Sequence, residues 1–191
     1  MDTLVGAKVR LEPLEPHHSA GLFAVLGNDD EAWRWMLTDT PHSISDIEKI
    51  VTSYIEERES GSREPYAVIN IASGEVVGTS SFMDISLSNR TREIGSTIYG
   101  RAFWRSPVNT ETKYLMLTHA FEVKESNRVC LKTDNLNYRS QAAIERIGGV
   151  REGTLRAHRI RTDGTLRDSV YYSILKTEWP GVKIKLQGLL T

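Results

Sequence analysis

The chain has 191 residues, of which 39% are hydrophobic and 26% charged, and this composition is typical of one soluble domain and not of a disordered or low-complexity chain. Its net charge of -1 lacks the basic excess of a nucleic-acid-binding protein, and a single cysteine, Cys130, excludes an internal disulfide. No apolar segment approaches the ~20 residues that cross a bilayer, and no Cys/His group has metal-ligand spacing, so we expect a cytoplasmic protein that binds neither membranes nor metal.

The first third of the chain is predicted to form one strand and three helices. Residues 8–14 alternate apolar and polar side chains, as a strand with one buried face does. Helical spacing of apolar residues follows over 17–26 and, more briefly, over 31–36. A longer helix begins after Ser43 or Ser45, whose side chains suit an N-cap position. This helix is expected to run through Ile44, Ile47, Val51, Tyr54 and Ile55 and to end near Gly61.

A change to a period of two predicts a β-sheet in the middle of the chain. Residues 65–72, 75–84 and 92–99 are rich in Val, Ile and Thr, and short polar turns separate them. This spacing predicts three antiparallel strands that follow one another directly.

The remaining chain alternates helices with strands. The expected elements are a helix at 109–125, a strand at 128–133, a helix at 137–147, strands at 150–161 and 166–175, and a basic amphipathic tail from Glu178. The first of these helices has an apolar stripe wide enough to cover a sheet, formed by Tyr114, Met116, Leu117, Ala120, Phe121 and Val123. The central antiparallel strands exclude a purely parallel sheet, so we expect a mixed sheet in a single α/β domain covering residues 1–191.

The segment between the third central strand and the next helix is a candidate anion site. A strand that leads through a tight loop into a helix directs free N–H groups and the positive end of the helix dipole at one point, which suits a pyrophosphate. Ser106 and Pro107 also have a structural explanation, because Ser is a common N-cap residue and Pro fits the first helical position. The residues alone allow both interpretations.

Asn137 and Ser140 lie at the start of the helix predicted for 137–147. Side chains of these types can cap the first turn, or they can bind a ligand that crosses the helix end. For either residue alone, capping is the simpler interpretation.

Positive charge is concentrated towards the C-terminus. Residues 151–191 carry eight Lys/Arg and four Asp/Glu, a net +4, which leaves -5 for residues 1–150. An anionic small molecule or an acidic partner would suit this region, although a solvated basic face accounts for most such residues. The arginines concerned are Arg151, Arg156, Arg159, Arg161 and Arg167.

Short motifs occur in a fixed order along nearly the whole chain. They lie at residues 9–14, 93–95, 109–111, 113–121, 137–140, 151–153 and 168–176, with Gly148 and Glu178-Trp179. Each is weak alone, but their joint order resembles the GNAT acyltransferases, in the branch of the ribosomal-protein N-acetyltransferases RimJ and RimL. The resemblance implies a mixed, mostly antiparallel sheet that splays open in the middle. Acetyl-CoA would enter there, and its pantetheine would pair with residues 96–99 like an added strand.

The residues that the resemblance assigns to acetyl-CoA depart from the family at one loop. The family's pyrophosphate loop has Gln or Arg, two residues, Gly, one residue, and Gly or Ala, where this chain has Trp104, Pro107 and Asn109. Pro107 has no N–H to donate, and Arg105 and Ser106 can supply a cationic or hydroxyl contact instead. The implied acetyl-CoA site comprises Ser96, Thr97, Ile98, Tyr99, Trp104, Arg105, Ser106, Val108, Asn109, Thr110, Asn137 and Ser140.

Acetyl transfer to an amine requires a neutral nitrogen, although a lysine amine has a pKa of ~10.4 and an α-amine one of ~7.7–8.0. The resemblance implies Glu93, at the head of the strand beside the acetyl group, as the base that removes the proton directly or through water. The alternative is a surface carboxylate paired with Arg90 or Arg92.

The departing thiolate benefits from a proton. Many GNAT members have a tyrosine seven residues after the motif asparagine, but this chain has Ile144 there. The resemblance to RimL leaves Ser140 as the acid, with Tyr138 as a second candidate. Backbone N–H groups of the splayed strand would stabilise the oxyanion, and Asn137 would orient the pantetheine.

Trp33 and Trp35 precede the long helix, where the family forms a substrate lip. Two residues at that spacing point to opposite sides of a helix, so at least one of them is expected to pack in the protein. Trp33 and Trp35 are nevertheless the candidate substrate-binding residues.

We therefore expect an acetyl-CoA-dependent N-acetyltransferase that transfers the acetyl group directly to a primary amine. A protein N-terminal amine is slightly favoured over a free amino acid, polyamine or drug. A non-catalytic acyl-CoA-binding regulatory module is the alternative of another class, indicated by Pro107 and Ile144. The expected partners are acetyl-CoA and the amine, with a homodimer allowed and neither nucleic acid nor membrane involved.

Overall fold

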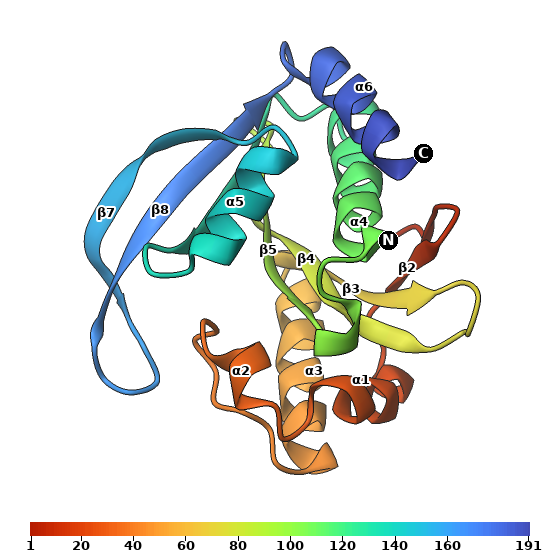
Figure 1. Cartoon of the computed structure of the whole chain (residues 1–191), viewed down its shortest axis with the longest axis vertical. Helices are drawn as coiled ribbons and strands as arrows, with labels where there is room; N and C mark the ends of the chain where they lie inside the picture. The colour runs from red at the N-terminus through yellow and green to blue at the C-terminus, as the bar shows by residue number, and fades with distance from the viewer.

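Eight strands form one sheet in the order β1-β2-β3-β4-β5-β6-β8-β7 (Figure 1). Neighbouring strands are antiparallel except β5 and β6, which are parallel. The structure is a computed structural model, and it describes all of residues 1–191. The strands are β1 (Leu4–Val5), β2 (Val9–Pro13), β3 (Arg63–Asn70), β4 (Val76–Ser86), β5 (Thr91–Tyr99), β6 (Arg128–Asp134), β7 (Val150–Ile160) and β8 (Leu166–Leu175).

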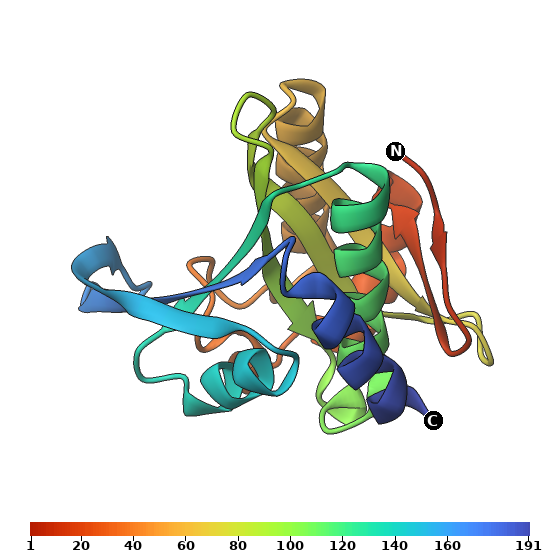
Figure 2. The same cartoon turned by 90° about the horizontal axis from the view of Figure 1, so that it is seen from above.

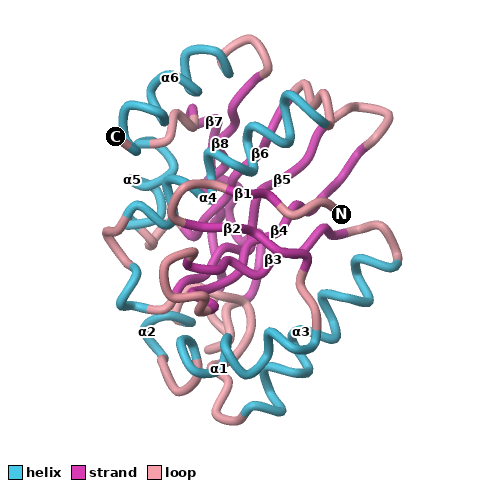
Figure 3. Tube along the Cα trace, turned by 90° about the vertical axis from the view of Figure 1, so that its right-hand side faces the viewer, coloured by secondary structure: helices cyan, strands magenta, loops and turns pink.

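Helices cover both faces of the sheet. In Figure 1, α3 lies in the lower part of the view and α4 and α6 in the upper part; in Figure 2, seen from above, α3 lies behind the central strands and α4 and α6 in front of them. Figure 3 shows α1, α2 and α3 gathered on one side of the strands and α4 and α6 on the other. No helix has the length and apolar character that a membrane crossing requires. The helices are α1 (Ser19–Leu26), α2 (Asp30–Trp33), α3 (Ile44–Glu59), α4 (Pro107–Thr118), α5 (Tyr138–Arg146) and α6 (Trp179–Leu190).

Side chains on the two faces of the central strands form two hydrophobic cores, one on each side of the sheet. In β3, Tyr66 and Val68 belong to the core under α4 and α6, whereas Ala67 and Ile69 belong to the core under α1, α2 and α3. Successive side chains of a strand point to opposite faces, so a strand covered on both sides needs an unbroken apolar run. The run from Tyr66 to Ile69 meets that need, and all four residues are at most 2% exposed.

The sheet opens between β5 and β6. These strands pair only from Thr91 to Glu93, opposite Arg128 to Cys130, and the rest of β5 has no partner on that side. On its other side, β5 has a β-bulge: Ser81 pairs with Gly95 and Thr79 with Ile98, so two residues of β5 oppose one of β4. Beyond Glu93, the main chain of β5 is therefore unpaired on the side of β6 and bulged on the side of β4.

The predicted order of elements is confirmed, and the strand predicted for 166–175 coincides with β8. The long helix begins as predicted, because Ser43 caps α3 and its side chain and that of Asp46 form a capping box. Ile44 is 43% exposed because it is the first residue of α3 and precedes the turn that packs on the sheet. The helix ends at Glu59, close to the predicted end near Gly61.

Three details differ from the predictions. The helix predicted for 109–125 ends as α-helix at Thr118 and continues as a π-helix over His119–Val123, which leaves Val123 59% exposed. The C-terminal tail is the helix α6, whose Trp179 stacks on Phe121 with ring centroids 5.4 Å apart. The short strand β1 was not predicted, since two residues are too few to show a period.

Candidate active site

The opening between β5 and β6 widens into a cavity of about 1080 Å³. Side chains from β5, from the loop before α4, from α5, from the segment between α2 and α3, and from the β7–β8 hairpin line it. This volume is slightly above the usual range for small-molecule and cofactor sites. The cavity is therefore large enough for two ligands that meet at β5.

Glu93 lies where β5 and β6 separate, and it is only 3% exposed. Its carboxylate forms an ion pair with Lys132 of β6, with Nζ and Oε2 2.7 Å apart. Lys132 also donates to the carboxylate of Asp84 on β4 at 3.2 Å. A carboxylate, a shared ammonium and a second carboxylate thus form a row from β5 through β6 to β4.

The alternative of a surface carboxylate paired with Arg90 or Arg92 is wrong. Arg92 extends to the opposite face of β5, where it donates to Ser126 Oγ at 2.9 Å and its guanidinium lies over the ring of Phe82. Adjacent residues of a strand face opposite ways, so Arg92 and Glu93 cannot pair across the sheet. Glu93 instead faces the cavity.

Burial raises the pKa of Glu93 to about 7. The ammonium of Lys132 opposes this rise because it favours the carboxylate, and the negative charge of Asp84 adds to it. A carboxyl group with a pKa near neutrality accepts a proton more readily than an ordinary surface glutamate does, and part of it remains ionised at neutral pH. Glu93 therefore has the protonation behaviour of a general base.

Sequence reasoning missed Lys132. Lys132 follows Leu131 in a strand where apolar and polar residues alternate, and this alternation predicts an exposed side chain. The residue that pairs with Glu93 is Cys130, two positions earlier on the same face of β6. Only the register of a parallel pair that is distant in sequence places this lysine beside the carboxylate.

The loop before α4 begins the helix in the way that Ser106 and Pro107 predict. Ser106 Oγ accepts from the N–H of Val108 at 3.3 Å, and Pro107 occupies the first helical turn. Arg105 has a φ of +58°, a left-handed conformation that glycine adopts without strain and arginine does not. The structural interpretation of these residues is confirmed, and the N-terminus of α4 lies in the cavity wall.

The indole of Trp104 and the guanidinium of Arg139 stack on each other in the same part of the cavity wall. Trp104 donates from Nε1 to the carbonyl oxygen of Tyr99 at 3.0 Å, which gives this end of β5 a partner within the protein. The guanidinium of Arg139, on α5, lies over the Trp104 ring with Cζ 3.4 Å from its centroid. Arg139 was not predicted as a site residue, because its stacking partner lies 35 positions away in the sequence.

A buried lysine lies behind the β-bulge of β5. Lys113 of α4 is 5% exposed, and its ammonium donates to the hydroxyls of Thr97 and Ser80, which also bond to each other at 2.8 Å. Burial lowers the pKa of Lys113 to about 7, and no carboxylate bonds to it. The side chain of Thr97 is therefore engaged with α4, on the face of β5 away from Glu93.

Asn137 is the N-cap of α5, since its Oδ1 accepts from the N–H of Ser140 at 3.1 Å. The capping interpretation of Asn137 is confirmed, and the residue also lines the cavity. Ser140 lines the cavity too, and its main-chain N–H is held by this cap. Ile144 lies one turn further along α5 and adds an apolar surface.

Most of the predicted site residues meet in this one cavity. Three do not. Trp33 is 4% exposed and donates from Nε1 to a main-chain oxygen of α1 at 2.8 Å, so its assignment to substrate is corrected to core packing, while Trp35 lines the cavity. Val108 is packed in the core, and Thr110 Oγ1 accepts from Arg146 at 3.0 Å, so only their main chain could meet a ligand. Those in the cavity wall are Glu93, Ser96, Thr97, Ile98, Tyr99, Trp104, Arg105, Ser106, Asn109, Asn137 and Ser140.

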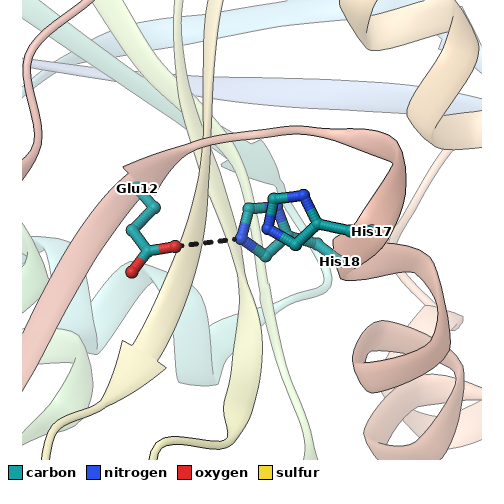
Figure 4. A group of neighbouring side chains, drawn as sticks. All are labelled: Glu12, His17 and His18. Carbon is teal, nitrogen blue, oxygen red and sulfur yellow. Dashed lines mark hydrogen bonds and ion pairs between the residues drawn. The ribbon is translucent and has the colours of Figure 1, made fainter.

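A second group of titratable residues lies outside the cavity. The side-chain ligand atoms of Glu12, His17 and His18 are within 4.8 Å of one another (Figure 4). His18 Nδ1 accepts from the N–H of Glu15 at 3.0 Å, so Nε2 carries the proton that is shared with Glu12, 3.2 Å away. Both ring nitrogens of His18 are thus used in the turn that follows β2.

Comparison with known proteins identifies this arrangement. A family model described as an acetyltransferase (GNAT) domain matches residues 8–150. The chain belongs to the GNAT acetyltransferase family. The mixed, splayed sheet expected from the sequence motifs is the sheet of this GNAT domain, and the chain is an N-acetyltransferase.

Individual relatives agree with this GNAT assignment. YdaF of Bacillus subtilis (strain 168), named as a ribosomal N-acetyltransferase, is 31% identical over 181 residues, covering 91% of this chain and 92% of YdaF. A GCN5-related N-acetyltransferase from Brucella melitensis has a TM-score of 0.93 at 32% identity, covering 100% of this chain and 86% of that one. Mycobacterium smegmatis RimJ, in a complex with CoA-disulfide, has the same fold, with a TM-score of 0.85 at 20% identity over 98% of this chain and 94% of RimJ.

Proposed function

We propose that this N-acetyltransferase moves the acetyl group of acetyl-CoA directly to a primary amine, with Glu93 as the general base. The observation that carries the proposal is the position of Glu93. It is a buried carboxylate with a pKa of about 7, and it lies where the sheet opens into a large cavity. A base of this kind can take the proton of an amine as the amine attacks a thioester.

The donor side of the cavity suits acetyl-CoA. The unpaired edge of β5 beyond Glu93 offers main-chain groups to the pantetheine, and the first turn of α4 offers free N–H groups and a positive dipole to phosphate. Arg105 and Arg139 add positive charge beside that turn, which offsets the N–H that Pro107 lacks. The CoA-disulfide complex of M. smegmatis RimJ, which has the same fold, supports this donor.

The proposed reaction uses few protein groups. The amine nitrogen forms a bond to the acetyl carbon while its proton passes to Glu93, and main-chain N–H groups of β5 stabilise the oxyanion. Collapse of this intermediate breaks the carbon–sulfur bond, and the thiolate takes a proton from solvent through the Ser140 hydroxyl. Burial raises the pKa of Cys130 to about 11, so this thiol stays protonated, which supports direct transfer without an acyl-enzyme.

A protein N-terminal amine is the acceptor that we favour. The name of YdaF as a ribosomal N-acetyltransferase supports it, and so does the breadth of the cavity between α3 and the β7–β8 hairpin. A free small amine is the alternative. The two differ in what must fit beside Trp35, since a peptide extends beyond the cavity and a small amine does not.

Release of CoA thiol from labelled acetyl-CoA, with panels of peptides and small amines, tests the proposal. We expect Glu93→Gln to lower kcat/KM by roughly 10²-fold or more while the Kd for CoA stays unchanged. Glu64→Gln is the matched control, because Glu64 is a half-buried carboxylate of β3 that pairs with Arg92 on the other face of the sheet. It should retain the wild-type rate.

Two results would contradict the proposal. Equal rates for the wild type and Glu93→Gln would remove Glu93 from the role of base. CoA binding without thiol release for any amine would favour a non-catalytic acyl-CoA-binding module.

A further inference from the structure

The β7–β8 hairpin places two arginines in the cavity wall that have no close carboxylate partner of their own. Arg159 of β7 and Arg167 of β8 are opposite each other in the register of the hairpin, and both line the cavity. Like charges at directly opposed positions destabilise an antiparallel pair. An anion bound between them would remove that repulsion.

Arg167 is the more unusual of the two because it is nine-tenths buried. The residue is 9% exposed, and Nε has no hydrogen-bond partner in the protein. The carboxylate oxygen nearest to Nε, Oδ2 of Asp134, is 3.8 Å away, and Arg161 already binds Asp134 at 2.7 and 3.0 Å. The guanidinium therefore has only a long ion pair to a carboxylate that another arginine already binds, and a buried cation of this kind has unused capacity for an anion in the cavity.

The other cations on this side of the cavity already have partners. Lys132 is held between Glu93 at 2.7 Å and Asp84 at 3.2 Å. Arg63 forms an ion pair with Glu57 at 2.7 Å. The hairpin arginines are therefore the groups on this side with unused capacity for an anion.

Their position assigns the anion to the acceptor and not to acetyl-CoA. Arg167 and Tyr171 lie on the same face of β8, and Tyr171 pairs with Lys132 of β6, the partner of Glu93. Arg159 is opposite Arg167 in the hairpin, so both arginines lie on the side of the cavity that holds the proposed base. The phosphates of the donor are expected at α4 instead. Figures 1 and 2 show α5 standing between the hairpin and α4.

We infer that the acceptor carries a carboxylate, which the guanidinium groups of Arg167 and Arg159 bind while the amine lies at Glu93. The inference rests on the proposed acetyl transfer and narrows its acceptor class. Guanidinium groups bind carboxylates through paired, charge-assisted hydrogen bonds, and arginine keeps its charge when buried. The carboxylate can belong to a free amino acid or to an acidic residue near the N-terminus of a peptide.

Matched acceptors test the inference and separate the two sources. Free amino acids are compared with their carboxamides, and peptides with Asp near the N-terminus are compared with the same peptides carrying Asn. We expect the wild type to favour the carboxylate member of one series by about tenfold or more in kcat/KM. Equal rates within both series would overturn the inference and leave the proposed function standing, whereas no transfer to any acceptor would overturn both.

Variants of the hairpin supply the second readout. Arg167→Met should raise KM for carboxylate acceptors about tenfold or more, with the KM of the amide acceptors and the Kd for CoA unchanged. Arg167→Lys should retain part of the preference for carboxylate over amide acceptors. Arg159→Met should lose part of this preference without affecting the fold, because Arg159 is exposed. Arg156→Met is the control, because Arg156 is exposed on the same strand and lies outside the cavity wall. If Arg167→Met and Arg159→Met both bind CoA more weakly while their acceptor KM is unchanged, the two arginines bind the donor and the inference is wrong.

Discussion

The two halves of the sheet, on either side of the opening, each bury a cation without a close carboxylate. In the half from β1 to β5, Lys113 is held by two hydroxyls behind the bulge of β5. In the half from β6 to β8, Arg167 lies in the cavity wall with an unpartnered Nε. The first half has helices on both faces (Figure 2), whereas most residues of β7 in the second half are exposed.

The difference lies in what the two cations can do when water is excluded. A lysine releases its proton, and burial lowers the pKa of Lys113 to about 7. An arginine remains protonated and needs an anion. Both cations line the cavity. The first half can hold its cation as a neutral amine, while the second half retains a charge that a ligand can use.

The difference in packing between the halves predicts the largest effect. Phe82 of β4 is fully buried against Tyr66, so Phe82→Ala should lower the free energy of unfolding by about 3–5 kcal/mol. Leu155 of β7 is 49% exposed, so Leu155→Ala should cost less than about 0.5 kcal/mol. Urea denaturation of both variants measures these values, and similar losses would show that the hairpin is packed as tightly as the centre.

Lys113→Met should stabilise the protein at neutral pH. The unfolded lysine holds its proton up to about 10.5 and the folded one only to about 7, so stability rises with pH between these values and is lowest at or below 7. The variant removes that penalty, and we expect its melting temperature to rise by roughly 4–8 °C at pH 7, with a smaller gain at pH 10.

Lys113→Arg is the informative control for this prediction. Arginine cannot release its proton, so that variant should melt below the wild type at every pH. If Lys113→Met melts lower at pH 7, the bonds of the ammonium to Thr97 and Ser80 outweigh its desolvation.

Lys132 connects the two halves, and its replacement should move the pH dependence of acetyl transfer. The rate rises with pH as Glu93 loses its proton, and Lys132 lowers the pKa of Glu93 while Asp84 raises it. Lys132→Met should therefore shift the acidic limb of kcat/KM to higher pH by about one unit, or about 1.4 kcal/mol, and Asp84→Asn should shift it to lower pH. If the acidic limb of the kcat/KM profile lies at the same pH in the wild type and in both variants, a group other than Glu93 controls it.

The smallest effect is expected at the start of α5. Asn137→Ala removes the cap and should cost about 1 kcal/mol of stability, and Ser140→Ala should leave stability nearly unchanged because the cap bonds to its main chain. Thermal melts compare the two. If Ser140→Ala also keeps full turnover, its hydroxyl has no part in protonating the thiolate.

Local patterns predicted most elements, because each depends on neighbouring residues. Alternating side chains predicted the strand at 166–175, and Ser43, a residue type common at N-caps, predicted the start of α3. Glu93 was assigned through family resemblance, and the burial that raises its pKa is set by strands far apart in the sequence. Nothing in the sequence distinguished Trp33 from Trp35, since the side chain that packs is decided by the position of α2 on the sheet.

The short pairing of β5 with β6 places Glu93 at the apex of a wedge. Three residue pairs, from Thr91 to Glu93, join the two parts of the sheet, and the cavity lies between these parts beyond the last pair. The carboxylate therefore starts from the point where the two walls of the cavity are joined by main-chain pairing. Its place is set by the sheet itself, whereas loops and helix ends shape much of the remaining wall.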